Sequence, residues 1–268
     1  MRATIRFVPL LLVALVGGCA PSGPLVPPIP PGIILNPEHP EFRMEAPDTF
    51  QVAFQTTAGD FLVNVARARA PHGADRFFNL VRAGFYDGAH FFRVVEGFVV
   101  QFGIPADPAM AAAWRQSRIP DDPVVTSNLK GSLSFASAGP DSRTTQLFIN
   151  LADNSRLDAM GFSPFGQVVE GMAVYETIHS GYGEGAPRGS GPNQGLIQSE
   201  GSAYLEREFP ELDRILTARI VGVGPYAPPD EDPDSLSSPD DAPDANPSGH
   251  GFTWTKRWIL RPVEASPT

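Results

Sequence analysis

Three polar side chains lie in stretches that are otherwise apolar, and their types limit the chemistry they could perform. In "FFRVVEGFVVQFG" Arg93 and Gln101 stand among phenylalanines and valines, and Gln146 opens the apolar run "QLFI". Strands with only a structural role would carry aliphatic side chains or surface charges there. A guanidinium stays charged at any relevant pH and, like an amide, donates hydrogen bonds with fixed geometry. These residues favour a site that acts by electrostatics and hydrogen bonding.

Signals for nucleophilic, metal or phosphate chemistry are weak. The five histidines lack metal-ligand spacing, and no Gly-x-Ser-x-Gly elbow occurs. The stretch "GYGEGAPRGSGPNQG" lacks the Gly-Lys-Ser/Thr ending of a phosphate-binding loop, so a long surface loop is expected. The acidic "PDEDPDSLSSPDD" lacks the glycine-turned loop and terminal glutamate of a calcium site. We therefore expect neither a metal ion nor a cofactor.

Short strands and two helices would position these side chains. Two alternating runs flank a turn at Gly59 as a hairpin, and a last strand is expected in "RILTARIVGV". One helix is predicted in "PHGADRFFNLVRAGFYDG", with Gly84 as its stop signal, and another after Glu170. No strand is followed regularly by a helix, which favours an antiparallel barrel or sandwich with helical caps. Further short strands are expected at residues 91–96, 98–103, 131–137 and 146–151.

Charge and composition exclude several classes of partner. The formal net charge is −10 and no basic run occurs, so a nucleic-acid interface is not expected. The 29 prolines and 26 glycines exceed what one core accommodates, which indicates tails or linkers. A single cysteine excludes an intrachain disulfide framework. We expect a monomer.

The N-terminus predicts export and anchoring. In "MRATIRFVPLLLVALVGGCA" two arginines precede an apolar run that is too short to span a bilayer but has the length found in secretory signals. "VGGC" resembles the bacterial lipobox, so we expect a signal peptide over residues 1–18 and lipid on Cys19. An ordinary signal peptide with an incidental cysteine is the alternative. The expected location is the cell envelope, on a bacterial membrane, facing the periplasm or exterior.

Four further segments follow the expected signal peptide. Proline density predicts an extended tether over residues 19–47, ahead of a domain over residues 48–223. Residues 224–250 are rich in proline, aspartate and serine, a composition typical of disorder. Residues 251–268 are aromatic again and could dock onto the domain, a partner or lipid.

Three stretches together resemble the signature regions of the cyclophilins, the peptidyl-prolyl cis-trans isomerases. They are "FFRVVEGFVVQFG", "GSLSFASAGPDSRTTQLFI" and "RLDAMGFSPFGQVVEGMAVYETI", in the family's order. The resemblance covers about residues 50–220. It implies a closed eight-stranded antiparallel β-barrel capped by two α-helices, with an active groove on one outer face.

The resemblance implies a role for each groove residue. Arg93 falls on the catalytic arginine, with Gln101 beside it as a group that holds the substrate backbone. Other positions expected to contact substrate are Phe98, Val99, Ala136, Ser137, Gln146, Phe148, Leu157 and Phe162. The apolar ones among them would grip the proline ring.

Several residues depart from the family pattern. Val99 takes the place of a methionine, Ser137 of an asparagine that contacts the substrate backbone, and Phe162 of a pocket histidine. Arg156 stands where many members carry a tryptophan. These changes leave the arginine and the proline pocket in place, and they bear on substrate preference and rate.

Two functions from different classes are consistent with this pattern. The first is an enzyme that accelerates prolyl isomerisation in folding extracytoplasmic proteins, with proline-containing polypeptides as partners. The second is a membrane-tethered module that binds proline-containing segments with weak or no catalysis. An isomerisation assay separates them.

Overall fold

The computed structural model describes residues 26–224, which belong to the first of two units of the chain, Met1–Ala227 and Pro228–Thr268. The predicted signal peptide over 1–18, the lipidated Cys19 and the aromatic segment over 251–268 lie outside the described residues. So do residues 225–250 of the predicted acidic segment.

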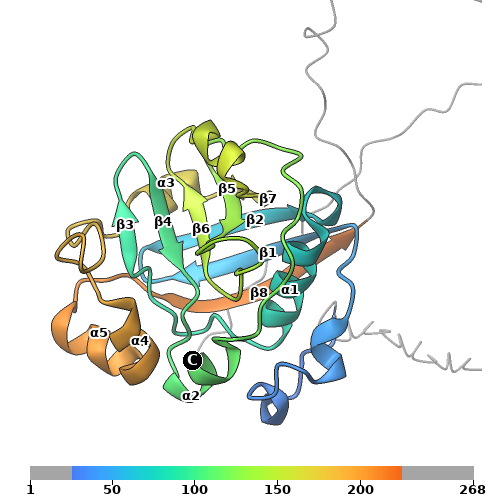
Figure 1. Ribbon diagram of the computed structural model, residues 1–268, viewed down its shortest axis with the longest axis horizontal. Coiled ribbons are helices and arrows are strands. Elements are labelled where there is room, and N and C mark those ends of the chain that lie inside the picture. Colours follow the sequence, from blue (N-terminus) through green and yellow to red (C-terminus); the bar gives the residue numbers. More distant parts are fainter. Residues whose placement is uncertain (1–25, 225–268) are drawn as a thin grey trace, which may run out of the picture. The chain divides into compact units, whose positions relative to one another are not determined.

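Eight antiparallel strands form one sheet in the order β3-β4-β6-β5-β7-β2-β1-β8. Figure 1 shows β3, β4, β6 and β5 crossing in front of β2, β1 and β8. The apolar side chains between these two layers form the core. The strands are β1 (Thr49–Thr56), β2 (Gly59–Ala66), β3 (Arg93–Val95), β4 (Val99–Phe102), β5 (Ser132–Phe135), β6 (Leu147–Asn150), β7 (Pro164–Glu170) and β8 (Ile215–Gly224).

The sheet is an open half-barrel, so the prediction of a closed barrel is wrong in this respect. β3 and β8 end the strand order and share no ladder. Only an isolated bridge between His90 and Arg214 and a few neighbouring backbone hydrogen bonds join the segments that precede them. Gly84 and Gly88, which have positive φ, lie in the turns that precede this bridge.

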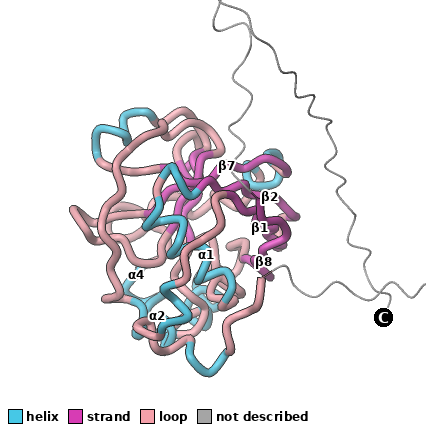
Figure 2. Tube along the Cα trace, turned by 90° about the vertical axis from the view of Figure 1, so that its right-hand side faces the viewer, coloured by secondary structure: helices cyan, strands magenta, loops and turns pink. Residues whose placement is uncertain are grey.

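Five α-helices accompany the sheet in the described residues, where two were expected. α1 (Pro71–Arg82) and α3 (Met172–Glu176) are the predicted ones. The others are α2 (Pro108–Trp114), α4 (Gln194–Glu200) and α5 (Ser202–Glu208). α2 and α4 lie side by side at one end of the molecule (Figures 1 and 2). Shorter 3₁₀ turns are η1 (Pro31–Ile33), η2 (Pro40–Arg43), η3 (Arg67–Arg69) and η4 (Ser155–Met160).

Phenylalanines fill the main core. Phe50 and Phe54 of β1 pack against Phe77 of α1, with ring centroids 6.1 and 6.4 Å apart, and Phe54 also stacks on Phe61 at 4.8 Å. Phe77 is completely buried. The helical spacing predicts one apolar face, whereas the structure buries all six residues from Phe77 to Arg82, so this half of α1 is covered on every side.

A second, smaller core joins α2, α4 and α5. Its buried members include Ala111, Ile197 and Leu205, one from each helix, packed with Phe92 and Ile104 from the region of β3 and β4. This cluster fixes the C-terminal helices beside the strands that carry the polar residues of interest.

Residues 26–47 of the predicted extended tether pack on the domain, so this part of the prediction is wrong, and residues 19–25 lie outside the described residues. Ile29, Phe42 and Ala46 are buried in the main core. Arg82, whose side chain is only 2% exposed, donates hydrogen bonds to the carbonyl of Pro27 and to Glu41. We call residues 26–47 the strap. Its isolated apolar residues between prolines supply enough buried surface to hold it in place.

Candidate active site

Strand register places the predicted catalytic residues in one row. Arg93 of β3 lies directly opposite Gln101 of β4, and Gln101 lies opposite Phe148 of β6. Paired residues of adjacent strands share a face of the sheet. The alternate row of Val94, Val100 and Ile149 is buried in the main core, so the first row faces outward.

A separate apolar cluster forms a pocket beside this row. Val99, Phe148 and Leu157 are its buried members, with exposed fractions of 2%, 5% and 5%. Phe98, Ala136 and Phe162 pack against them, and the rings of Phe148 and Phe162 meet edge to face at 5.5 Å. The pocket has a volume of about 360 Å³ and is also lined by Arg93, Gln101 and Ser137. It therefore combines an apolar floor with a guanidinium at its edge.

Buried amides hold the loop that carries Leu157 and Phe162. Asn154 donates to the carbonyl of Phe98 at 2.9 Å and to Asn150 at 2.8 Å. Asn128 donates to the carbonyl of Phe162 at 2.8 Å. Each of the three asparagines is at most 1% exposed. Buried amides satisfied in this way fix backbone positions, so the pocket is pre-formed.

Arg93 is engaged from two sides. Its Nε and Nη2 donate to the two carboxylate oxygens of Glu184, each at 2.7 Å, and its Nη1 donates to Gln101 Oε1 at 3.1 Å. The hydrogen bonds and charge of Arg93 lower the pKa of Glu184, so this carboxylate is ionised at neutral pH. The guanidinium also lies 5.6 Å from the ring centroid of Phe98. The side chain of Arg93 is 17% exposed, which leaves it accessible from the pocket.

Gln146 does not line this pocket but continues its polar row. It accepts a hydrogen bond of 2.9 Å from Gln101 Nε2 and donates one of 3.2 Å to Gln194 Oε1, at the start of α4. The amides are thus arranged in one donor–acceptor direction from Arg93 to Gln194. Nine of the ten predicted site residues line the pocket, and Gln146 holds one of them in place.

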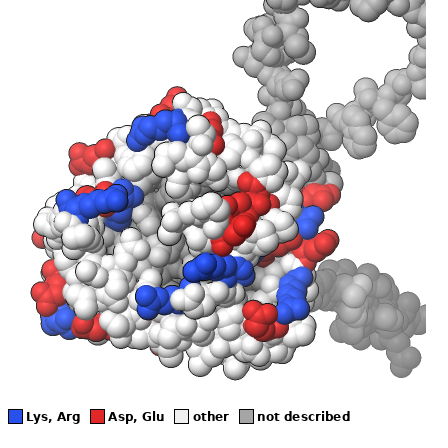
Figure 3. Space-filling view, in the orientation of Figure 1, with Lys and Arg blue, Asp and Glu red and all other residues white. Residues whose placement is uncertain are grey.

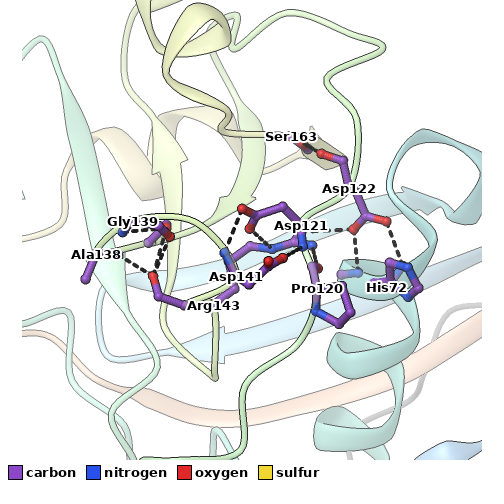
Figure 4. A network of polar contacts seen from close by, with 12 residues as sticks. His72, Pro120, Asp121, Asp122, Ala138, Gly139, Asp141, Arg143 and Ser163 are labelled. Carbon is purple, nitrogen blue, oxygen red and sulfur yellow. Dashed lines mark hydrogen bonds and ion pairs between the residues drawn. The ribbon is translucent and has the colours of Figure 1, made fainter.

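The turn that follows Ser137, another residue of the pocket lining, is held by polar contacts, and Figure 4 shows its Gly139 near the network of Arg143. The Ser137 hydroxyl donates to the carbonyl of Gly139 at 2.6 Å and pairs with Ser142 at 3.0 Å. Buried Arg143 contacts Asp122 at 3.0 Å and the carbonyl of Pro120. The hydroxyl of Ser137 is therefore used inside its own turn, while its residue lines the pocket.

Sequence reasoning missed four residues that line the pocket. Met160 is on η4, and Gln194 begins α4. Glu184 and Arg188 come from the glycine-rich stretch that was expected to be only a surface loop. No pattern in the linear sequence indicates that Glu184 reaches Arg93, because 91 positions separate them.

Comparisons with known proteins agree with this geometry. The sequence model of the family "Cyclophilin type peptidyl-prolyl cis-trans isomerase/CLD" matches residues 51–194. Peptidyl-prolyl cis-trans isomerase A of Dickeya dadantii is 37% identical over 133 residues, which cover 47% of this chain and 70% of the relative. Isomerase B of Escherichia coli is 32% identical over 136 residues, covering 47% and 82%.

A solved structure of a cyclophilin type isomerase from Cryptosporidium parvum is also similar. It has a TM-score of 0.48 and 19% identity and covers 66% of this chain and 99% of that chain. The same protein in the presence of the dipeptide Ala-Pro gives 0.47 and 20%, with 64% and 99% covered.

The half-barrel carries an outward arginine beside an apolar pocket, and the sequence matches specify the class of protein. The chain belongs to the family of cyclophilin-type peptidyl-prolyl cis-trans isomerases. It is accordingly an enzyme of prolyl isomerisation.

The described residues also bear on metal binding, membrane-spanning helices and surface charge. Within residues 26–224, no group of three or more His, Cys, Asp or Glu side chains is placed to hold a metal ion. No helix of this same stretch has the length and hydrophobicity to cross a bilayer. Figure 3, drawn from the side of β3, β4 and β6, shows mostly uncharged side chains over these strands, with Lys and Arg in separate groups around them.

Proposed function

We propose that the enzyme acts on exported proteins from a lipid anchor on Cys19, using Arg93 to stabilise the twisted X-Pro bond. The observation that carries the catalytic part is the row of Arg93, Gln101 and Phe148 across three adjacent strands, beside an apolar pocket. The sequence "VGGC" carries the anchoring part.

The chemistry follows from the amide itself. Rotation about an X-Pro bond has a barrier near 18–20 kcal/mol because the twisted state loses resonance. Twisting leaves a lone pair on the proline nitrogen and shifts charge on the preceding carbonyl. A guanidinium that donates to this nitrogen favours the twisted state over both planar states, and an apolar surround strengthens its field. Each 1.36 kcal/mol of such preference gives about tenfold in rate.

The pocket supplies binding and orientation. Phe98, Phe148 and Leu157 would hold the proline ring by apolar contact, so that the bond to be twisted lies against Arg93. No proton transfer, nucleophile or cofactor takes part in this mechanism. The peptide remains intact and only one torsion changes.

Two measurements test the two parts separately. Acceleration of cis-trans exchange in a proline peptide, followed by NMR, tests the catalytic part. Binding of the peptide without acceleration would instead support a proline-peptide binding module. For the anchor, Cys19→Ser should abolish lipidation and move the protein out of the membrane fraction. Unchanged membrane association of this variant contradicts anchoring through Cys19.

A further inference from the structure

The glycine-rich loop over residues 180–193 folds back onto the groove and delivers one carboxylate to Arg93. Glu184 meets the Nε and Nη2 edge of the guanidinium in a two-pronged contact, with both distances 2.7 Å. Such planar, bidentate pairs fix orientation as well as attracting charge. Because the Glu184 side chain is 36% exposed and Arg93 17% exposed, the pair lies at the boundary between pocket and solvent.

The backbone of the loop positions the Glu184 carboxylate. The backbone N–H of Gly185 donates to Glu184 Oε1 at 3.0 Å, which orients the carboxylate from its own loop. The N–H of Gly191 donates to the carbonyl of Glu184 at 2.9 Å. A Cβ at Gly191 would lie 2.8 Å from that carbonyl oxygen, and one at Gly189 would collide with it outright. Only glycine at both positions allows the loop to close around Glu184.

The loop is also held at both ends. Ser180 donates to Glu96 at 2.6 Å, next to β3. At the other end Gln194 accepts from Gln146, which is connected through Gln101 to Arg93. The loop is therefore tied at its start to Glu96, the residue after β3, and at its finish to the polar row, so both ends of the segment that carries Glu184 are held.

Arg93 loses rotational freedom through these contacts. A guanidinium has five N–H donors, and Glu184 and Gln101 engage three of them. Of the two donors left over, one lies on Nη1, which also binds Gln101, and one on Nη2, which also binds Glu184. A side chain with several rotatable bonds is thereby held in one plane before substrate binds, and this pre-organisation is what a transition-state donor requires.

Glu184 has two effects of opposite sign on the rate. It holds Arg93 in one orientation, which favours the reaction, and its negative charge weakens the electric field of the guanidinium, which opposes it. Coulomb energy falls with distance, and a substrate nitrogen hydrogen-bonded to one of the remaining donors would lie nearer to the guanidinium than to the Glu184 carboxylate. The field at a nitrogen hydrogen-bonded to those donors is dominated by the nearer group. We infer that Glu184 is a positioning residue for Arg93, whose role is to raise the rate of bond twisting. This inference rests on the proposed arginine mechanism.

Glu184→Gln is the first test. The amide keeps the length of the side chain and one acceptor but loses the charge and the fork. We expect kcat to fall about tenfold, equivalent to roughly 1.4 kcal/mol of barrier, with KM changed less than about twofold. Glu184→Asp keeps the charge but has a shorter side chain, so its kcat should lie between those of the wild type and Glu184→Gln. Glu200→Gln is the matched control, because it removes the same charge from Glu200 of α4, which forms an exposed ion pair with Arg207 of α5.

A spectroscopic readout separates positioning from a general structural role. In Glu184→Gln the Nε–H resonance of Arg93 should shift and exchange faster with water, while the amide resonances of β3 and β4 stay in place. An unchanged kcat, an increased kcat or an unaltered Nε–H signal would each overturn the inference.

The double variant distinguishes this inference from the proposed mechanism. Adding Glu184→Gln to Arg93→Ala should cause no further loss. If Arg93→Ala itself retains full activity, the arginine mechanism fails. If Arg93→Ala is inactive while Glu184→Gln is fully active, only the role of Glu184 is wrong.

Discussion

Arg93 and Gln101 face each other across β3 and β4, and Arg93 Nη1 donates to Gln101 Oε1 at 3.1 Å. Gln101 is fixed in turn by its hydrogen bond of 2.9 Å to Gln146. The position of the guanidinium is thus set by strand register and by a chain of amides, and it depends on planar geometry as well as on charge. A compact ammonium group cannot make the same set of contacts.

Arg93→Ala should reduce isomerase activity about a hundredfold or more, the usual cost of removing a transition-state donor. Arg93→Lys should not restore the rate. Since Arg93 faces outward, the midpoint of thermal unfolding should change little. Exchange spectroscopy on a proline peptide measures the rate, and a near-wild-type rate in either variant rules out the assigned mechanism.

Arg156 lies with its guanidinium 4.8 Å from the ring centroid of Phe98, at the position where the family resemblance places a tryptophan in members that bind cyclosporin well. An aromatic anchor at a hot spot contributes about 2 kcal/mol or more, which is some thirtyfold in affinity at about 1.4 kcal/mol per decade. Arg156→Trp should therefore tighten cyclosporin binding by about that factor and change kcat/KM much less. Calorimetric titration tests this. Tight binding by the wild type, or no gain in the variant, refutes it.

Burial and the nearby charge of Arg214 lower the pKa of His90 from 6.5 to about 4. Its Nδ1 is buried and makes no hydrogen bond within the described residues. Between these two values the unfolded chain binds a proton that the folded chain does not, so the free energy of unfolding falls as pH falls from about 6.5 to 4. The loss should be on the order of 3 kcal/mol.

Urea unfolding at several pH values measures this loss. His90→Gln should flatten the pH dependence by that amount. Equal slopes in wild type and His90→Gln would show that His90 is not the titrating group.

Phe42 of the strap contacts Trp114 edge to face at 4.8 Å and is 8% exposed. Phe42→Ala should lower the free energy of unfolding by about 3 kcal/mol, as expected for a buried ring. Leu35→Ala in the same strap, where the side chain is 53% exposed, should change it by less than about 0.5 kcal/mol. Equal, small effects of both changes would mean that the strap does not contribute to stability.

Local periodicity was sufficient to predict the parts of the fold that depend on neighbours in sequence. The hairpin of β1 and β2, helix α1 and the cores of the short strands β3 to β6 all lie within the expected ranges. The outward row of Arg93, Gln101 and Phe148 follows from those strands once their register is known.

Features that depend on distant contacts could not be read in this way. Glu184 lies in a loop whose composition indicates only surface exposure. Its glycines allow the loop to close so that Glu184 contacts Arg93 of β3. The helices α4 and α5 are each seven residues long, and they are stabilised by the small core they share with α2. The strap was predicted to be an extended tether from its proline density. A few apolar residues between the prolines, such as Ile29 and Phe42, pack into the core instead.

The packed strap also limits how far the folded domain could lie from an anchor at Cys19. Val26 lines a depression with Val81 of α1 and Ile220 of β8, apart from the groove on β3, β4 and β6. Seven residue steps separate Cys19 from Val26, and they span at most about 25 Å, against about 100 Å for a leash that ran free to residue 47. With lipid on Cys19 as proposed, the enzyme would stay within a thin layer of solvent beside the bilayer. Clients would then be selected by where they emerge as much as by which prolines they carry.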